Sequence, residues 1–171
     1  SLWENKMIRS ANIDDACRIA EIQIFGWRSA YRGIVSDDIL FRKLIVTSKS
    51  IRLEKSITEG VDNFFVLEED EIIKGFIICG KSRSEDRPES YELYAIYVEP
   101  LMKGLKIGTQ LINFFDNIAV QQGYKSSILW VFNENERSRH FYEKNGYSLE
   151  GKEAYLEEFN AWEVRYIKFY E

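Results

Sequence analysis

The chain has 171 residues, of which 45% are hydrophobic and 30% charged, a balance that excludes intrinsic disorder over most of its length. This length favours one domain, so we expect a single domain over residues 1–171. The formal net charge of -5 excludes a general electrostatic attraction to nucleic acid or to an anionic membrane surface.

The N-terminal third is expected to hold one strand followed by helices. Apolar residues at helical spacing and capping residues predict a strand at 6–10 and helices over 13–24, from near Ser36, and over 47–58. The stretch that follows Gly26 is interrupted, so we expect the first helix not to continue through it.

The rest of the chain alternates strands with helices. We predict a hairpin over 63–80 with an acidic turn at 68–70, an exposed loop over 81–90, strands over 90–98 and 126–132, helices over 108–122 and 136–145, and a final pair of strands near 147–154 and 161–169. This order predicts an α/β (α+β) fold class, in which a mixed sheet carries helices on its faces.

Few residues are suited to metal or thiol chemistry. Cys17 and Cys79 lie in apolar surroundings, where a free thiol behaves as a small hydrophobe. The single histidine, His140, lies off the apolar face of its helix, so we interpret it as a solvated surface residue. No apolar run approaches the ~20 residues of a membrane span, and the first ten residues lack the apolar core of a secretory signal. We therefore expect a cytoplasmic protein without a metal site.

The join between the strand that ends at Val98 and the helix that begins at Gly108 is the first unit that points to a ligand. Its turn holds Gly104, and glycine lets the backbone approach an anion without a Cβ in the way. A helix start offers unpaired N–H groups and the positive end of the helix dipole, and Thr109 adds a hydroxyl donor. The join predicts a phosphate site, although similar joins in many α/β proteins bind nothing.

Two well-known phosphate loops are absent from this join. The residues after Gly108 are Thr109 and Gln110, which excludes the G-x-x-x-x-G-K-[ST] loop. The three-glycine dinucleotide fingerprint is missing as well.

The second unit is FNENERSRHFYEKNGY, residues 132–147. Asn135 is placed to cap the following helix, and Ser138, Phe141 and Tyr142 then lie on one face of it. Tyr142 is a phenol on the side that faces the sheet. A buried core tyrosine with a satisfied hydroxyl is the alternative interpretation.

Together the two units resemble the signatures of the GCN5-related N-acetyltransferase (GNAT) family. The first signature, [Q/R]-x-x-G-x-[G/A] after a V-x-P strand end, is similar to residues 98–108, with Lys103 in place of Gln or Arg and Lys106 in place of the middle glycine. Lys106 either crowds a pyrophosphate or supplies a cation near it. The second signature, N-x-x-[A/S]-x-x-F-Y-x-x-x-G-[F/Y], matches at Asn135, Ser138, Phe141, Tyr142, Gly146 and Tyr147.

The resemblance implies a single-domain fold with a mixed, mostly antiparallel sheet of about seven strands and helices on both faces. A bulge in the fourth strand then splays it from the fifth. It also implies transfer of an acetyl group from acetyl-CoA to a primary amine of a small molecule, peptide or protein by direct attack. The alternatives are a non-catalytic CoA-binding module on the same fold, which Lys106 supports, and a nucleotide-binding regulatory domain of another fold.

The family's cofactor contacts carry over by position. The resemblance implies that the backbone of Ile96, Tyr97 and Val98 binds the pantetheine arm, with the Val98 N–H polarising the thioester oxygen. It also implies a set of cofactor-binding residues in the two signatures: Lys103, Gly104, Lys106, Ile107, Gly108, Thr109, Asn135, Ser138 and Tyr142. Tyr142 is the expected general acid, because a phenol with a pKa near ~10 stays protonated at neutral pH and can protonate a thiolate.

The base and the acceptor site are less defined. Glu92 lies six residues before Val98, so alternation places both on one face in the absence of a bulge, with an exposed strand-edge glutamate as the alternative. Trp27, Tyr31 and Tyr94 are candidate walls of the acceptor site, and core packing is the alternative for the Trp27–Tyr31 pair. The acidic balance is compatible with a cationic amine. The oligomeric state stays open, a homodimer included.

Overall fold

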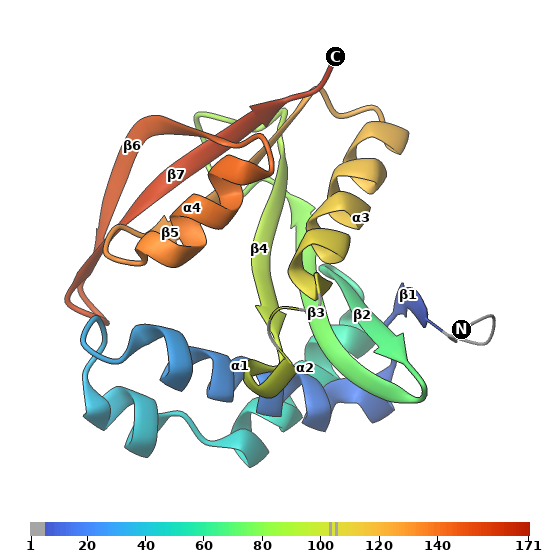
Figure 1. Ribbon diagram of the computed structural model, residues 1–171, viewed down its shortest axis with the longest axis vertical. Coiled ribbons are helices and arrows are strands. Elements are labelled where there is room, and N and C mark those ends of the chain that lie inside the picture. The colour runs from blue at the N-terminus through green and yellow to red at the C-terminus, as the bar shows by residue number, and fades with distance from the viewer. Residues whose placement is uncertain (1–5, 103, 105) are drawn as a thin grey trace.

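The computed structural model describes residues 6–102, 104 and 106–171 and has a seven-stranded sheet at its centre (Figure 1). The strands are β1 (Lys6–Ser10), β2 (Asn63–Glu69), β3 (Ile72–Lys81), β4 (Tyr91–Val98), β5 (Ser126–Phe132), β6 (Ser148–Leu156) and β7 (Ala161–Phe169). They lie in the order β1-β2-β3-β4-β5-β7-β6, and the central β4–β5 pair is parallel while the other pairs are antiparallel. The expected mixed, mostly antiparallel sheet is confirmed.

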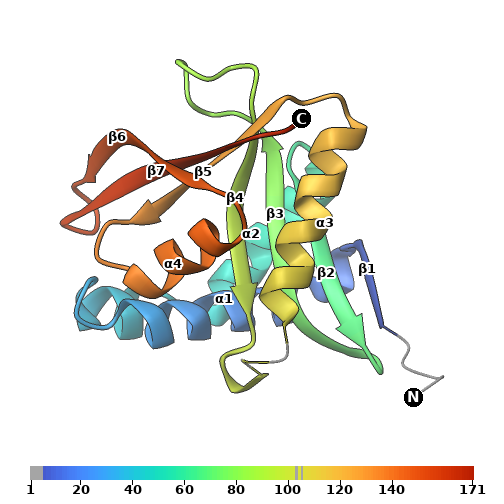
Figure 2. The same cartoon turned by 45° about the horizontal axis from the view of Figure 1, so that its top comes forward.

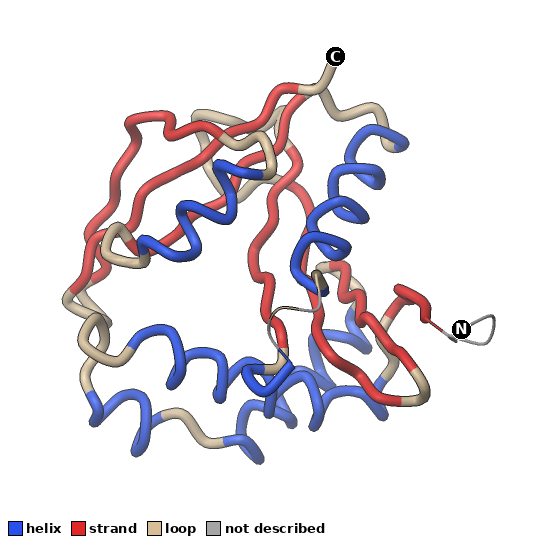
Figure 3. Tube along the Cα trace, in the orientation of Figure 1, coloured by secondary structure: helices blue, strands red, loops and turns tan. Residues whose placement is uncertain are grey.

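Helices cover both faces of this sheet (Figures 1 and 3). They are α1 (Ala16–Tyr31), which follows a short 3-10 turn η1 (Ile13–Asp15), the π-helical turn η2 (Ile39–Lys43), α2 (Val46–Glu59), the 3-10 turn η3 (Pro100–Met102), α3 (Ile107–Gln121) and α4 (Glu136–Lys144). The predicted helices are thus confirmed within a few residues, except at the end of α1. None of the helices in the described part of the chain is long and apolar enough to cross a membrane.

The expected interruption after Gly26 is wrong, because α1 continues through this glycine to Tyr31. Gly26 is buried, and a Cβ at this position would lie 2.9 Å from the ring of Tyr97 on β4. Glycine costs a helix about 1 kcal/mol relative to alanine, but here its small size lets α1 lie directly against the sheet. Tertiary packing therefore outweighs the local propensity.

The core has a cluster on each face of the sheet and a third at one end. On the α3 side Leu111, Phe115 and Leu129 are buried together, and on the α1–α2 side Ile19 and Phe76 are. The third cluster gathers around the end of α1 and consists of Val35, Leu40, Phe132 and Ala161, with Trp27, Tyr31 and Phe159 packed against it. Burial of these side chains supplies the main drive for folding.

Gly75 on β3 brings α3 close to the sheet. A Cβ at Gly75 would lie 2.9 Å from Leu111 Cδ1, 3.0 Å from the Tyr97 carbonyl oxygen and 3.1 Å from Ile107 Cγ2. Ile107 and Leu111 belong to the first turns of α3. The missing side chain therefore fixes the N-terminus of α3 against the sheet, beside the end of β4.

We expect Gly75→Ala to lower the free energy of unfolding by about 1–3 kcal/mol, because the added methyl overpacks the β3–α3 contact. Urea unfolding measures this change. Leu111→Ala in the Gly75→Ala background removes one of the crowding atoms, so the double variant should lose less than the sum of the two single losses. An unchanged stability for Gly75→Ala would show that this contact is not tight.

Candidate active site

Strand β4 contains a β-bulge at Tyr94. Across the β3–β4 pair, Ile78 is opposite Ala95 and Cys79 is opposite Leu93, so Tyr94 is an extra residue. The Arg83 guanidinium lies 3.6 Å from the centre of the Tyr94 ring, and the Tyr94 hydroxyl donates a hydrogen bond to the Lys81 carbonyl. Because these contacts fix the tyrosine side chain, they stabilise the irregular backbone.

The bulge coincides with the point where β4 and β5 separate. The two strands pair only between residues 91–93 and 127–129, although β4 continues to Val98 and β5 to Phe132. Figures 1 and 2 show them diverging toward the side where α1 and α4 lie. The bulge that the family resemblance implied is therefore present, and one edge of β4 lacks a neighbouring strand beyond it.

The hydrogen-bond pattern determines which backbone groups of β4 face this opening. The Glu99 N–H donates to the Lys74 carbonyl at 2.8 Å, and alternate residues of an antiparallel pair bond to the partner strand. The amide of Tyr97 therefore faces β3. The N–H and C=O groups of Ile96 and Val98 face the other way, where no described strand pairs with them. Tyr97 contributes its ring to the site instead of its backbone.

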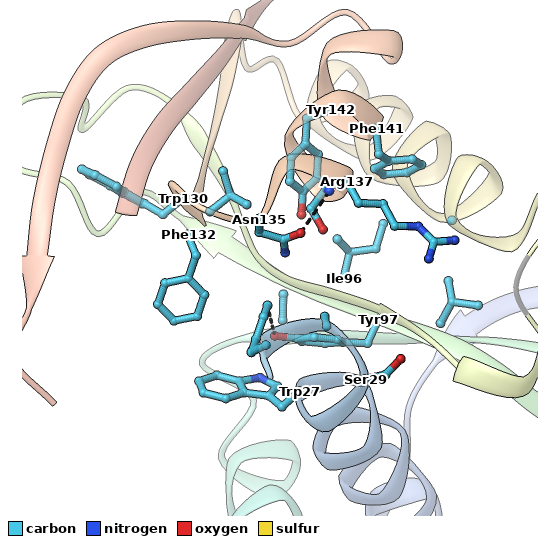
Figure 4. A pocket seen from close by; sticks show the side chains of 18 of the residues that line it. Trp27, Ser29, Ile96, Tyr97, Trp130, Phe132, Asn135, Arg137, Phe141 and Tyr142 are labelled. Atoms are coloured by element: carbon cyan, nitrogen blue, oxygen red, sulfur yellow. Dashed lines mark hydrogen bonds between the residues drawn. The ribbon is translucent and has the colours of Figure 1, made fainter. Parts of the chain in front are cut away.

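A cavity of about 660 Å³ lies between the separated strands (Figure 4). It is lined by β4, β5, α1, the first turns of α3 and α4, the end of β6, Phe159 between β6 and β7, and one residue of β7. The sequence-predicted residues that line it are Trp27, Tyr31, Tyr94, Ile96, Tyr97, Val98, Gly104, Lys106, Ile107, Gly108, Thr109, Asn135, Ser138 and Tyr142. Glu92 is not among the lining residues, and Lys103 lies outside the described residues.

The N-terminus of α3 forms a cradle for an anion at one end of the cavity. The first intrahelical bond runs from the Gln110 N–H to the Lys106 carbonyl at 3.1 Å, so the amides of Ile107, Gly108 and Thr109 have no intrahelical acceptor. A Cβ at Gly108 would lie 3.3 Å from the Phe141 ring, so glycine lets α3 and α4 meet closely here. These amides and the helix dipole suit a phosphate.

Lys106 occupies the position of a signature glycine and adopts the backbone conformation that glycine favours. Its φ of 59° and ψ of 21° lie in the left-handed region, which costs an L-residue roughly 1–2 kcal/mol. The side chain is exposed at the edge of the cavity. The backbone of Lys106 thus has a glycine-like conformation although the glycine is replaced.

Asn135 caps α4, as the sequence predicted. Its Oδ1 accepts a hydrogen bond from the Ser138 N–H at 3.2 Å, and the residue is only 7% exposed. Gly146 ends the helix with a φ of 90°. Together these two residues fix α4 over the cavity, and the Asn135 side chain lies at its wall (Figure 4).

Tyr142 extends from α4 into the cavity (Figure 4). Its ring is buried against Phe141, Tyr147 and Tyr166, with ring centres 5.5–6.4 Å apart. Its hydroxyl forms no hydrogen bond with any described residue. Burial, with a smaller contribution from Tyr31, raises the pKa of Tyr142 well above its usual range. The phenol therefore stays protonated and is available as a donor to a ligand.

Aromatic rings form the far wall of the cavity. Trp27 lies edge-to-face with Tyr31 at 4.9 Å and with Phe159 at 5.1 Å, and Tyr31 lies 4.9 Å from Phe132. The hydroxyls of Tyr31 and Tyr97 are hydrogen-bonded at 3.2 Å. Trp27 and Tyr31 pack in the core and also line the cavity, so the two interpretations of this pair are compatible. We call Trp27, Tyr31, Phe132 and Phe159 the aromatic wall.

The expectation that Glu92 shares a face with Val98 is wrong. The extra residue at Tyr94 reverses the alternation: Leu93 packs on the α3 side before the bulge, and Val98 does so after it. Glu92 therefore faces the opposite side from Val98. Its carboxylate is 2.8 Å from the Arg83 N–H, which donates to it, and the residue is 6% exposed. Burial raises its pKa.

A second carboxylate, Glu163 on β7, lines the cavity although sequence reasoning missed it. It pairs across strands with Phe132 of the aromatic wall. Burial and the negative charge of Glu92 raise the pKa of Glu163 to about 7. Strand alternation offers a signal, since it places this charged residue on the same face as Ala161 and Ile167.

The described residues contain no cluster of three or more His, Cys, Asp or Glu side chains placed to hold a metal ion. The polar groups that line the cavity include backbone amides, an asparagine, several hydroxyls, the cations Lys106 and Arg137, and the Glu163 carboxylate. This set can bind a phosphate at one end, donate hydrogen bonds in the middle, and accept a proton at the other end.

The comparisons with known proteins agree with this geometry. The sequence model of the acetyltransferase (GNAT) family matches residues 36–147, which include both signatures. The chain is 28% identical over 128 residues to an uncharacterized N-acetyltransferase of Bacillus subtilis, YuaI, covering 75% of this chain and 72% of that protein. It is 26% identical over 151 residues to a spermidine N(1)-acetyltransferase of Thermoplasma acidophilum, covering 84% and 88%.

A solved structure has the same fold. The PaiA N-acetyltransferase from Thermoplasma acidophilum, in complex with coenzyme A, superposes with a TM-score of 0.76. The superposition covers 97% of this chain and 99% of that one, at 23% sequence identity. The arrangement of seven strands and the helices around them is therefore that of a known acetyltransferase structure.

We expect Lys106→Gly to raise the free energy of unfolding by about 1 kcal/mol, because glycine relieves the left-handed backbone at a modest entropic cost. Lys106→Gln is the matched control, since it removes the charge and keeps the backbone strain. Urea unfolding should show a gain for glycine and none for glutamine. Equal effects of the two variants would assign the change to the charge instead.

Proposed function

We propose that this chain, which belongs to the acetyltransferase (GNAT) family and is an acetyl-CoA-dependent N-acetyltransferase, acts on a cationic primary amine such as a polyamine. The observation that supports this proposal is a single cavity with three parts. It has an anion cradle at one end, the unpaired edge of β4 with the Tyr142 phenol in the middle, and the aromatic wall with the Glu163 carboxylate at the other end.

The residues present fit coenzyme A. The amides at the start of α3 suit its diphosphate, and the outward-facing groups of Ile96 and Val98 suit an extended pantetheine arm, which pairs as a strand would. Asn135 at the cavity wall is placed to contact the same arm. The Lys106 replacement does not favour the non-catalytic alternative, because the backbone keeps the glycine-like conformation.

The chemistry follows from the groups around the middle of the cavity. Acetyl-CoA, when bound, supplies an acetyl group activated as a thioester. The Val98 N–H faces the opening and polarises the acetyl carbonyl, and losing a donor of this kind costs about 2.7–4 kcal/mol in other enzymes. Tyr142 gives its proton to the departing sulfur. Its raised pKa keeps the phenol protonated until a strong base such as a thiolate forms beside it.

The acceptor end of the cavity supports a cationic amine. Aromatic faces attract cations, and the aromatic wall presents several rings to this end. Glu163 adds a carboxylate, and the net charge of -5 favours the approach of a cation. The likeness to a spermidine N(1)-acetyltransferase points to the same class of acceptor.

We expect thiol release from acetyl-CoA with linear diamines and triamines, at about tenfold higher kcat/KM than with a monoamine of the same length. One desolvated cation–π contact of about 1–2 kcal/mol supplies this difference. The alcohol of matched length is the control and should give no product. Tight CoA binding by calorimetry without turnover on any amine would contradict the proposal and favour a binding module.

We expect Tyr142→Phe to lower kcat by about 10²–10⁴-fold with little change in CoA affinity, because the phenol donates a proton only as sulfur departs. Tyr155→Phe on β6 removes a hydroxyl from an exposed tyrosine that does not line the cavity, and should leave kcat unchanged. Stopped-flow assays with chemistry rate-limiting measure kcat, and calorimetry measures affinity. An unchanged kcat for Tyr142→Phe would remove the phenol from the reaction.

A further inference from the structure

We propose that Glu163 on β7 is the catalytic base that takes the proton from the attacking amine. This inference rests on the proposed function, and it adds the base that the proposed acetyl transfer requires. The two proton transfers of the reaction then take place on opposite faces of the sheet, with Glu163 on one side and Tyr142 on the other.

The strand register places Glu163 on the acceptor side. Residues directly opposite each other on neighbouring strands share a face, and Glu163 is opposite Phe132 of β5 and Ala154 of β6. Phe132 packs with Trp27 and Tyr31 from α1. Glu163 therefore lies on the α1 side of the sheet, next to the aromatic wall.

Tyr142 reaches the same cavity from the opposite face. It belongs to α4 and packs in the core cluster that covers the α3 side. Glu163 and Tyr142 both line the cavity because β4 and β5 separate beyond Leu93 and leave an opening through the sheet. An acetyl group held in this opening has the phenol on one side and the carboxylate on the other.

Glu163 has no partner in the described part of the chain, unlike the charged groups beside it. Two positions along β7, Arg165 is 2% exposed and bonds to both carboxylate oxygens of Asp86 and to Glu150. No hydrogen bond or ion pair joins the Glu163 carboxylate to any described residue. A half-buried carboxylate is costly without a partner, so its retention in a cavity points to a cationic ligand.

The surroundings of Glu163 suit a base that works near neutral pH. The ionisable groups that line the cavity with Glu163 are Tyr94 and Tyr97 on β4, Tyr31 on α1, Lys106 before α3, and Arg137 and Tyr142 on α4. On its own face of the sheet, Glu163 also has Glu92 on β4 and Arg165 two positions along β7. Of these, Glu92 is the one whose charge raises the pKa of Glu163, after burial. The carboxylate form predominates above pH 7 and is lost as the pH falls below 7.

The proposed step balances in atoms and charge. The attacking ammonium group first loses one proton to solvent, because only the neutral amine has a lone pair. As the amine nitrogen bonds to the acetyl carbon and the bond from that carbon to sulfur breaks, Glu163 accepts one proton from nitrogen and Tyr142 gives one proton to sulfur. Glu163 then releases its proton to solvent, and the Tyr142 phenolate takes one up. The amide and the free thiol are the products, and both side chains return to their starting forms.

The test compares the pH profile of kcat in wild type and three variants. Glu163→Gln should lower kcat by about 10²–10⁴-fold and lose the acidic limb near pH 7. Glu92→Gln still accepts the Arg83 N–H but removes the neighbouring charge, so it should shift the limb to lower pH. Glu157→Gln, at an exposed glutamate in the β6–β7 turn, is the matched control and should change neither quantity.

A direct titration gives a second readout that needs no turnover. In the protein without ligands, the NMR signal of a ¹³C-labelled glutamate carboxyl should titrate near pH 7, disappear in Glu163→Gln and move to lower pH in Glu92→Gln. An acidic limb that persists in Glu163→Gln, or a higher KM alone, would overturn the inference in favour of simple ammonium binding. Absence of transfer by wild type to any amine would refute the proposed function instead.

Discussion

The extra residue at Tyr94 in β4 is the constraint on which the site depends. A regular strand would pair with β5 along its whole length, and its backbone groups would be satisfied by the sheet. The bulge ends this pairing after Leu93, which leaves the outward groups of Ile96 and Val98 without a strand partner. Unpaired backbone groups on a strand edge invite an extended ligand, so a local irregularity becomes a binding surface. The same residue turns the side chains after it to the opposite face, and thereby decides which of them meet the ligand.

The cavity also depends on close approaches that glycine allows. Gly26 lets α1 lie against Tyr97, Gly75 lets α3 lie against β3, and Gly108 lets the first turn of α3 lie against Phe141 of α4. Each contact holds one helix in place near the end of β4. Because three elements from distant parts of the sequence converge there, the amides of α3, the phenol of α4 and the rings of α1 face one small volume.

The sequence predicts those features that neighbouring residues determine, and it misses those that depend on residues far apart in the chain. The strands, the helix starts and the Asn135 cap follow from neighbouring residues, and the sequence identified them within a few positions. The continuation of α1 through Gly26 depends on Tyr97, 71 positions later, so helix propensity gave the wrong end. The face of Glu92 depends on one inserted residue, which shifts the alternation and leaves no clear trace in YELYAIYV. Alternation indicates the face of β7 on which Glu163 lies, but its position at the cavity follows from the long-range pairing of β7 with β5, which local periodicity does not reveal.

Glu92 and Glu163 carry the same carboxylate group, but their surroundings give them different properties. Glu92 faces the same side of the sheet as Glu163 and is more deeply buried, but it accepts a backbone N–H from Arg83, which stabilises its charge. Glu163 has no such donor among the described residues, and the charge of Glu92 makes a second negative charge nearby less favourable. In the proposed mechanism, Glu92 therefore acts on Glu163 through its charge. A base with a pKa far below 7 would hold a proton too weakly to take it from an amine. Burial, together with the nearby negative charge of Glu92, raises the pKa of Glu163 and so suits it to the proposed role of base.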